Sequence, residues 1–208
     1  METSLIVFYT HRLRGDLARL PQLYTFLRRL RRDYAAYGRA LLLDLGESCA
    51  PNVFPCALTG GRSILIALDA MGYDAANVSG QLSAEDRARL DASHLQMALV
   101  DAAHPYHKDG IVVTVGVDEI ASVAKVHIDV DPTNKSHVKN GILRLASVEQ
   151  GQVGLARLTL DHGRVCLEET HTLETPADVT PDPTIAGAIE FILGEARYLQ
   201  RKQGMNTA

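Results

Sequence analysis

The segment after residue 100 contains side chains that could bind a metal ion. His104 and His107 follow an apolar run at residues 97–100. Together with Asp101 or Asp109 they would supply enough ligands for one ion. A polar loop after a strand explains the same residues without a ligand, and we favour that interpretation. Metal binding through His104 and His107 is the alternative.

A threonine and two glycines at residues 59–61 form a second candidate site, because they precede a segment with helical character. Free backbone N–H groups at the start of a helix can bind an anion. A glycine pair without further support is usually a simple turn, so we assign no ligand to it.

The composition favours one folded domain. The chain has 208 residues, of which 46% are apolar and 22% charged. This is enough apolar material for one buried core and too little for two large domains. We therefore predict a single domain over residues 1–200, followed by a frayed tail over residues 201–208.

The charge argues against nucleic acid as a partner. The net charge is −4 and the pI about 6.0, whereas a broad phosphate-binding surface needs excess positive charge. The first 40 residues do contain eight arginines against three acidic residues. Surface arginines on a helix are usually solvated, so they do not change this prediction.

Neither a membrane segment nor a disulfide is predicted. No run of 18 apolar residues is present, and the first residues lead into an apolar strand without a basic segment or cleavage site. We therefore predict a cytoplasmic protein that does not enter a membrane. Cys49, Cys56 and Cys166 are an odd number in a chain too large to need disulfides, so we expect reduced thiols.

Two strands and a helix are predicted near the N-terminus. Residues 5–9 and 40–45 are continuous apolar runs, typical of strands buried on both faces. Apolar residues recur at three- and four-residue steps over residues 20–34, as in an amphipathic helix. The order strand, helix, strand indicates a right-handed crossover, so the two strands should be parallel neighbours.

Further helices and strands are predicted along the rest of the chain. Helices are expected over residues 61–71, after an N-cap at Ser83 and after an N-cap at Asp182. After residue 123 we expect no parallel strands, and residues 161–163 should form a hairpin turn. The remaining predicted strands are residues 75–78, 97–100, 111–115, 126–130, 142–146, 155–160 and 165–170.

Several segments resemble the 5′-nucleotidase branch of the calcineurin-like metallophosphoesterases. Residues 5–15, Leu-Ile-Val-Phe-Tyr-Thr-His-Arg-Leu-Arg-Gly, look like its opening strand, where the family reads Thr-Asn-Asp-x-His-Gly. Residues 41–48, Leu-Leu-Leu-Asp-Leu-Gly-Glu-Ser, look like its second motif, Leu-Leu-Asp-x-Gly-Asp. Residues 67–75 and 151–160 are similar to two later segments. The resemblance implies an α/β fold, a four-layer sandwich of two mixed sheets flanked by helices, truncated in its second half.

The same resemblance implies that most metal ligands are missing. Such enzymes hold two divalent cations that activate a bridging hydroxide. The aspartate and histidine of the first motif correspond to Arg12 and Arg14, and a guanidinium group has no lone pair to offer a metal. The carboxylate of the second motif corresponds to Glu47, and the third motif is replaced by Ser-Gly-Gln-Leu at residues 79–82. We therefore expect no cofactor, the alternative being a divalent metal such as Mn, Fe or Zn.

The arginines suggest two roles. In the first, Arg12 and Arg14 form salt bridges with Glu47 and with Asp44, filling the vacated pocket without metal. In the second, they bind a phosphate, because guanidinium groups suit phosphate and α/β folds bind ligands at the carboxyl ends of strands. We favour the first role. The candidate ligand-binding set is Arg12, Arg14, Asp44, Glu47 and Gln81.

The sequence therefore predicts a catalytically degenerate domain. It would be a binding or interaction module for a nucleotide, another phosphorylated small molecule or a protein partner. The alternative is an active metal-dependent phosphoesterase whose site is rebuilt from Glu47, Asp44, His104 and His107. A structural subunit of a larger assembly is a third class.

Overall fold

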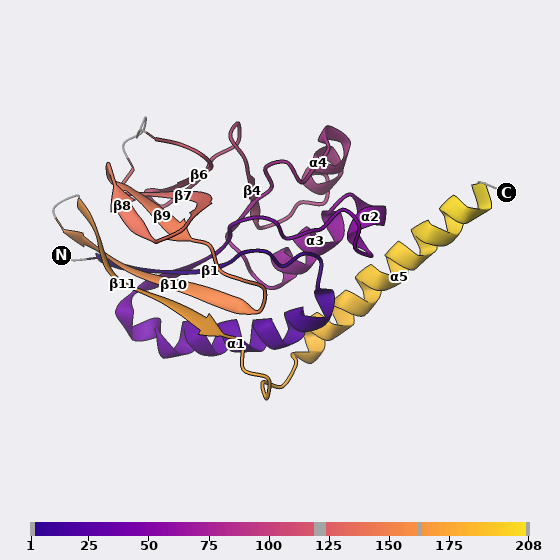
Figure 1. The fold of residues 1–208 in the computed structure, drawn as a ribbon, viewed down its shortest axis with the longest axis horizontal. Coiled ribbons are helices and arrows are strands. Elements are labelled where there is room, and N and C mark those ends of the chain that lie inside the picture. The colour runs from indigo at the N-terminus through magenta and orange to yellow at the C-terminus, as the bar shows by residue number, and fades with distance from the viewer. Residues whose placement is uncertain (1–2, 119–123, 162–163, 207–208) are drawn as a thin grey trace.

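The computed structural model describes residues 3–118, 124–161 and 164–206. Strands and helices alternate in the first half of the chain, strands dominate the second half, and a long helix closes it (Figure 1). The strands are β1 (Thr3–Thr10), β2 (Arg39–Asp44), β3 (Ala75–Asn77), β4 (Ala98–Val100), β5 (Tyr106–Lys108), β6 (Ile111–Thr114), β7 (Val126–Thr133), β8 (His137–Lys139), β9 (Ile142–Ala146), β10 (Gln152–Asp161) and β11 (Arg164–Glu174). The helices are α1 (Leu20–Asp33), α2 (Cys56–Thr59), α3 (Arg62–Ala70), α4 (Ala84–Asp91) and α5 (Pro183–Asn206), with short 3-10 helices at Leu17–Arg19 and Ala35–Tyr37.

The first sheet has the strand order β11-β10-β1-β2-β3-β4. β1 to β4 are parallel neighbours, whereas β10 runs antiparallel to both β1 and β11. The parallel pairing of β1 with β2 confirms the crossover predicted through α1. It also places the loops that follow β1 and β2 at the same edge of the sheet.

Residues 5–9 of β1 are all apolar because both faces of the first sheet are covered. Ile6 and Phe8 belong to a core shared with α1, α3 and α5. Leu5, Val7 and Tyr9 belong to a second core, shared with the other sheet. Successive side chains of a strand point to opposite faces, so a strand between two cores needs apolar residues at every position.

The second sheet has the strand order β5-β6-β7-β9-β8. β6, β7 and β9 are parallel, and the edge strands β5 and β8 are antiparallel to their neighbours. Our expectation of no parallel strands after residue 123 is therefore wrong. A short apolar strand carries no signal of its direction, and the chain returns from β7 to β9 through β8, a three-residue edge strand that the sequence analysis did not include.

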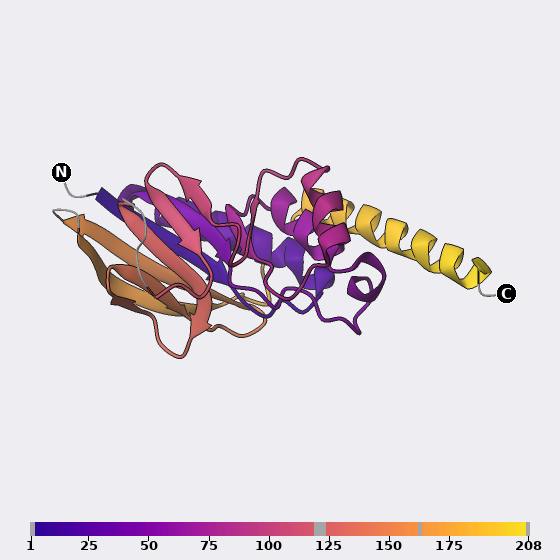
Figure 2. The ribbon, with the colours of Figure 1, turned by 90° about the horizontal axis from the view of Figure 1, so that it is seen from above.

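The two sheets pack face to face, and helices lie on the outer face of the first one (Figures 1 and 2). The predicted α/β fold of two mixed sheets flanked by helices is confirmed. The expected helical layer over the second sheet is not formed by the described residues, since the segments that build this sheet contribute strands only.

The predicted helix starts are confirmed where a side chain caps the helix. Ser83 Oγ accepts the backbone N–H of Asp86 at 3.1 Å at the start of α4. Asp182 Oδ1 accepts that of Ile185 at 3.1 Å at the start of α5. β10 and β11 pair as the predicted hairpin, whose turn residues 162–163 lie outside the described residues.

The closing helix is longer than predicted. We expected a frayed tail from residue 201, but α5 continues to Asn206. No helix in the described part of the chain combines the length and the apolar character needed to cross a bilayer. The division into one domain and the cytoplasmic location stay predictions.

Candidate functional site

The carboxyl ends of β1 and β2 continue into a pair of loops that lie side by side. The backbone N–H of Arg12 donates to the carbonyl of Gly46, and that of Arg14 to the carbonyl of Glu47, both at 3.1 Å. These bonds extend the parallel pairing of the strands into the loops. The structure therefore brings Arg12, Arg14 and Glu47 together, as the sequence predicted.

The same three residues have left-handed backbone conformations. The φ angle is 58° at Arg12, 53° at Arg14 and 50° at Glu47. For a residue with a side chain this conformation costs about 1 kcal/mol or more. Strain of this kind persists only where the surroundings enforce it, and it clusters at functional sites. The backbone geometry of the loops after β1 and β2, as well as their residue types, therefore indicates a candidate functional site.

Arg12 binds two carboxylates. Its Nη1 donates to Glu149 Oε1 at 2.7 Å, and its Nε lies 3.4 Å from Glu47 Oε2. The hydrogen bond with Glu149 and the charge of Glu47 raise the pKa of Arg12. Arg14 is held more loosely, with its Nη2 4.0 Å from Glu47 Oε2 and a side chain 55% exposed. Arg12, Arg14, Glu47 and Glu149 form a cluster of balanced charge, which we call the ion cluster.

The sequence analysis did not single out Glu149 or His11. Glu149 follows β9 and lies 137 residues from Arg12 in the chain, so no local spacing connects them. His11 is 2% exposed, and its Nδ1 lies 2.9 Å from Ser147 Oγ, while its Nε2 lies 3.6 Å from Glu47 Oε1. Burial lowers the pKa of His11 in spite of the nearby Glu47 charge. A neutral imidazole therefore lies against the ion cluster.

Asp44 is separate from the ion cluster. It is fully buried, its Oδ1 accepts the Thr10 hydroxyl at 3.0 Å, and its Oδ2 accepts the Ser48 hydroxyl at 2.6 Å and the Gly46 N–H at 3.1 Å. Burial raises the pKa of Asp44 to about 7, and these hydrogen bonds oppose the shift. The expected ion pair of Asp44 with the arginines is not formed among the described residues, because Asp44 points into the protein and finds neutral donors there.

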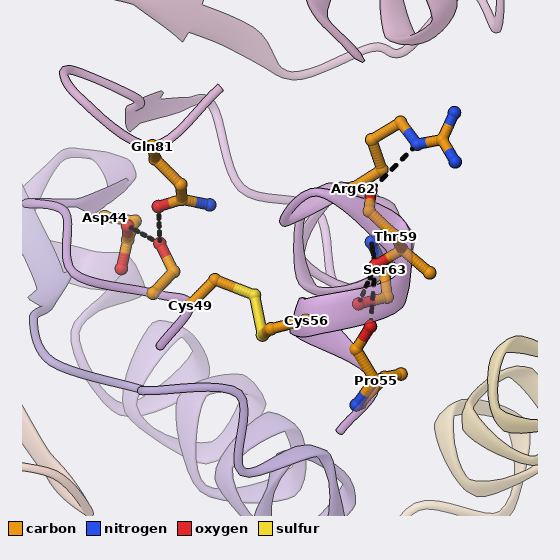
Figure 3. Close-up of a disulfide and its surroundings, with 9 residues drawn as sticks. Asp44, Cys49, Pro55, Cys56, Thr59, Arg62, Ser63 and Gln81 are labelled. Atoms are coloured by element: carbon orange, nitrogen blue, oxygen red, sulfur yellow. Dashed lines mark hydrogen bonds between the residues drawn. A yellow bond between two sulfur atoms is a disulfide. The ribbon is translucent and has the colours of Figure 1, made fainter. Parts of the chain in front are cut away.

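Gln81 lies beside the buried Asp44 network, not far from a disulfide (Figure 3). Its Oε1 lies 3.5 Å from Ser48 Oγ, and its Nε2 is buried without a hydrogen-bond partner among the described residues.

Cys49 and Cys56 form the disulfide, so our expectation of reduced thiols is wrong for this pair. Bridging depends on proximity, which composition does not show: the loop between the cysteines brings their Cα atoms to 5.8 Å.

Loss of this disulfide is expected to lower the free energy of unfolding by about 2 kcal/mol, because the bridge restricts the unfolded chain. Urea unfolding of a Cys49→Ser/Cys56→Ser double variant measures the loss. Cys166 is exposed and not bridged, so Cys166→Ser is the control and should leave stability unchanged. A double variant as stable as the natural protein would contradict a structural role for the bridge.

The anion site considered at residues 59–61 is filled by the protein itself. A Cβ added to Gly60 would collide with the carboxylate of Asp86, so this carboxylate packs directly against the turn before α3. Asp86 Oδ1 also lies 3.4 Å from Arg62 Nε. The carboxylate of Asp86 therefore provides the negative charge that a bound anion would otherwise bring to the start of α3.

Solved structures share this arrangement of sheets and helices. No protein-family model and no curated protein matches the sequence. A calcineurin-like phosphoesterase, YfkN from Bacillus subtilis, matches over 96% of this chain and 100% of its own, with a TM-score of 0.63 and 12% identity. The sulfate thiohydrolase SoxB from Thermus thermophilus, in complex with glycerol, has a TM-score of 0.69 and 12% identity. The chain has the calcineurin-like phosphoesterase fold.

At this level of identity the likeness establishes the calcineurin-like phosphoesterase fold and not an activity. The match with SoxB covers 92% of this chain but only 60% of SoxB, so SoxB contains a large part without a counterpart here. Any activity of this chain has to be argued from its own residues.

The strand ends of this phosphoesterase fold do not fit a two-metal centre. Two bridged cations need several carboxylate, imidazole or amide ligands. Arg12 and Arg14 have no lone pair to offer, and Glu47 is held near both of them. Gln81 is directed at Ser48. We therefore derive no step through a metal ion.

The alternative metal site is not assembled either. His104 Nδ1 lies 2.8 Å from Asp101 Oδ1, and His107 is part of β5, where we expected a loop. Across the described residues, no group of three or more His, Cys, Asp or Glu side chains could hold an ion. Glu47, His104 and His107 accordingly do not form a common site there.

Proposed function

We propose that this domain does not hydrolyse phosphate esters and acts as an interaction module for a protein partner. The observation that carries the proposal is the ion cluster: Arg12 at the end of β1 is bound to both Glu47 and Glu149. Positions that resemble metal-ligand positions thus contain cations, which repel a metal ion and cannot coordinate it.

The charge of the ion cluster favours a protein over a nucleotide. An anionic ligand would have to displace a carboxylate from Arg12, whose side chain is only 32% exposed. The Arg14 side chain is 55% exposed and could reach a phosphate, but Glu47 places a negative charge 4.0 Å from its Nη2, and Glu149 adds a second negative charge on the neighbouring Arg12. These charges oppose binding of a nucleotide. A balanced set of exposed charges is typical of the polar part of a protein interface.

Metal content and hydrolysis together test the proposal. The purified protein is incubated with Mn²⁺, Fe²⁺ or Zn²⁺, desalted, analysed for metal and assayed with AMP and with bis(p-nitrophenyl) phosphate. The expected result is no stoichiometric metal and no turnover above a metal-only control. Two equivalents of metal per chain together with turnover would overturn the proposal in favour of an active phosphoesterase.

Two matched variants separate the structural role of the arginines from phosphate binding. Arg12→Met is expected to lower the melting temperature more than Arg14→Met, because Arg12 holds two carboxylates at shorter distances. ATP and pyrophosphate should not raise the melting temperature of the natural protein. A ligand-induced increase that is lost in Arg14→Met would instead show that the site binds phosphate.

A further inference from the structure

α5 turns aromatic side chains away from the rest of the protein. Its inner face is buried, with Ile189 and Ile192 each 5% exposed. On its outer face Phe191 is 76% exposed and Tyr198 is 59% exposed. Figure 1 shows that the C-terminal part of this helix extends beyond the other elements. Two large aromatic side chains exposed on one helix face make this face a candidate surface for contact with another molecule.

Glycines alternate with these aromatic side chains. The outer row, which we call the α5 seam, consists of Gly187, Phe191, Gly194 and Tyr198. Its steps are four, three and four residues, the spacing of a coiled-coil contact row. A Cβ added to Gly187 or Gly194 would meet no other atom within 4 Å, so each glycine leaves a notch beside an aromatic side chain. Each glycine also weakens the helix relative to alanine.

We propose that two copies of this chain form a symmetric dimer by packing their α5 seams antiparallel. With the two-fold axis between residues 192 and 193, Phe191 of one copy fits over Gly194 of the second copy. The same operation places Tyr198 over Gly187. Every bulky side chain then meets a notch, and each contact occurs twice, as in an isologous interface. A second copy is the occupant because the seam is complementary to itself.

The charges beside the seam favour the same orientation. Glu190 and Arg197 are exposed and lie on one edge of the seam. In an antiparallel pair, Glu190 of each copy lies beside Arg197 of the other copy. In a parallel pair, Glu190 would lie beside Glu195 of the other copy, and like charges repel. The charges and the shape of the α5 seam therefore both favour the antiparallel pair.

The dimer is expected to be weak, since one helix pair buries less surface than a stable interface between subunits. Sedimentation equilibrium of the full chain over a wide range of concentration measures it, and a reversible monomer–dimer equilibrium is the expected result. Phe191→Glu should raise the dimer dissociation constant about ten-fold or more, since buried aromatic side chains dominate such contacts. Gln200→Glu, which adds the same charge on an exposed position of α5 outside the seam, should leave it unchanged.

Gly194→Leu distinguishes a shaped interface from non-specific apolar adhesion. Filling the notch should weaken the dimer, although the substitution adds apolar surface and favours the helix. Circular dichroism checks that the variant is folded.

Glu190→Arg and Arg197→Glu should each weaken the dimer, and the double variant should restore it. A chain that is monomeric at every concentration, or a Gly194→Leu variant that associates more strongly, would overturn the proposal, which does not depend on the ion cluster.

Discussion

Gly154→Ala is expected to lower the free energy of unfolding by about 3 kcal/mol. Gly154 in β10 pairs directly with Tyr9 in β1, and the tyrosine ring lies across the glycine. A Cβ at residue 154 would collide with three carbons of this ring. The ring cannot move aside easily, because Tyr9 is 1% exposed within the core between the sheets. Urea unfolding of the variant measures the loss.

A double-mutant cycle checks that the ring is the cause. Tyr9→Ala alone should destabilise the protein because it leaves a cavity. Adding Gly154→Ala to Tyr9→Ala should cost little, since the new methyl group then has room. Strictly additive losses of the two substitutions would contradict the contact between residues 9 and 154 as the source of the strain.

The elements that could be predicted from the sequence are those whose pattern is local. β1, β2 and α1 follow from two apolar runs and a helical period, and their parallel crossover follows from handedness. The pairing of β7 with β6 and β9 could not be predicted in this way, because the side-chain pattern of a strand of about five residues does not show in which direction the strand runs relative to its neighbours. Three-residue strands such as β5 and β8 are too short to show a period.

The candidate site was predictable where its residues follow neighbouring parallel strands. Arg12 and Glu47 were expected to meet because both correspond to metal-ligand positions in the resembled family, and the parallel pairing of β1 with β2 brings them together. Glu149 was not expected at the site, because it lies 137 residues from Arg12 in the chain. His11 was not expected there either, because the sequence does not show that its side chain is buried. The Cys49–Cys56 bridge depends likewise on the path of the loop between the cysteines.

Asp44→Asn is expected to remove a large pH dependence of stability. Burial raises the pKa of Asp44 from its ordinary value of 3.8 to about 7. Between these values the folded protein keeps the proton and the unfolded chain releases it, so rising pH favours unfolding. The natural protein should therefore lose about 4 kcal/mol of stability from this group between about pH 4 and pH 7. The difference in unfolding free energy between natural protein and variant, measured against pH, isolates the effect.

Asparagine suits the site because Asp44 has neutral donors for partners. Its carbonyl oxygen can accept the Ser48 hydroxyl and the Gly46 N–H, and its amide can donate to Thr10, whose hydroxyl lies 3.0 Å from Tyr73 Oη and can donate to it. Above about pH 7 the variant should be more stable than the natural protein, because a buried charge is avoided.

Asp129→Asn is the matched control for Asp44→Asn. Asp129 is also buried, at 1% exposed, but its Oδ2 lies 3.4 Å from Arg144 Nε. Removing its charge leaves the mostly buried Arg144 with the exposed Asp118 as its carboxylate partner among the described residues, so this variant should be less stable than the natural protein at neutral pH. The same substitution is thus expected to have opposite effects at two buried carboxylates, according to whether a cation is beside them. If Asp44→Asn also destabilised the protein at pH 8 by a similar amount, Asp44 would be acting as a required charge, and the neutral-donor description of its surroundings would be wrong.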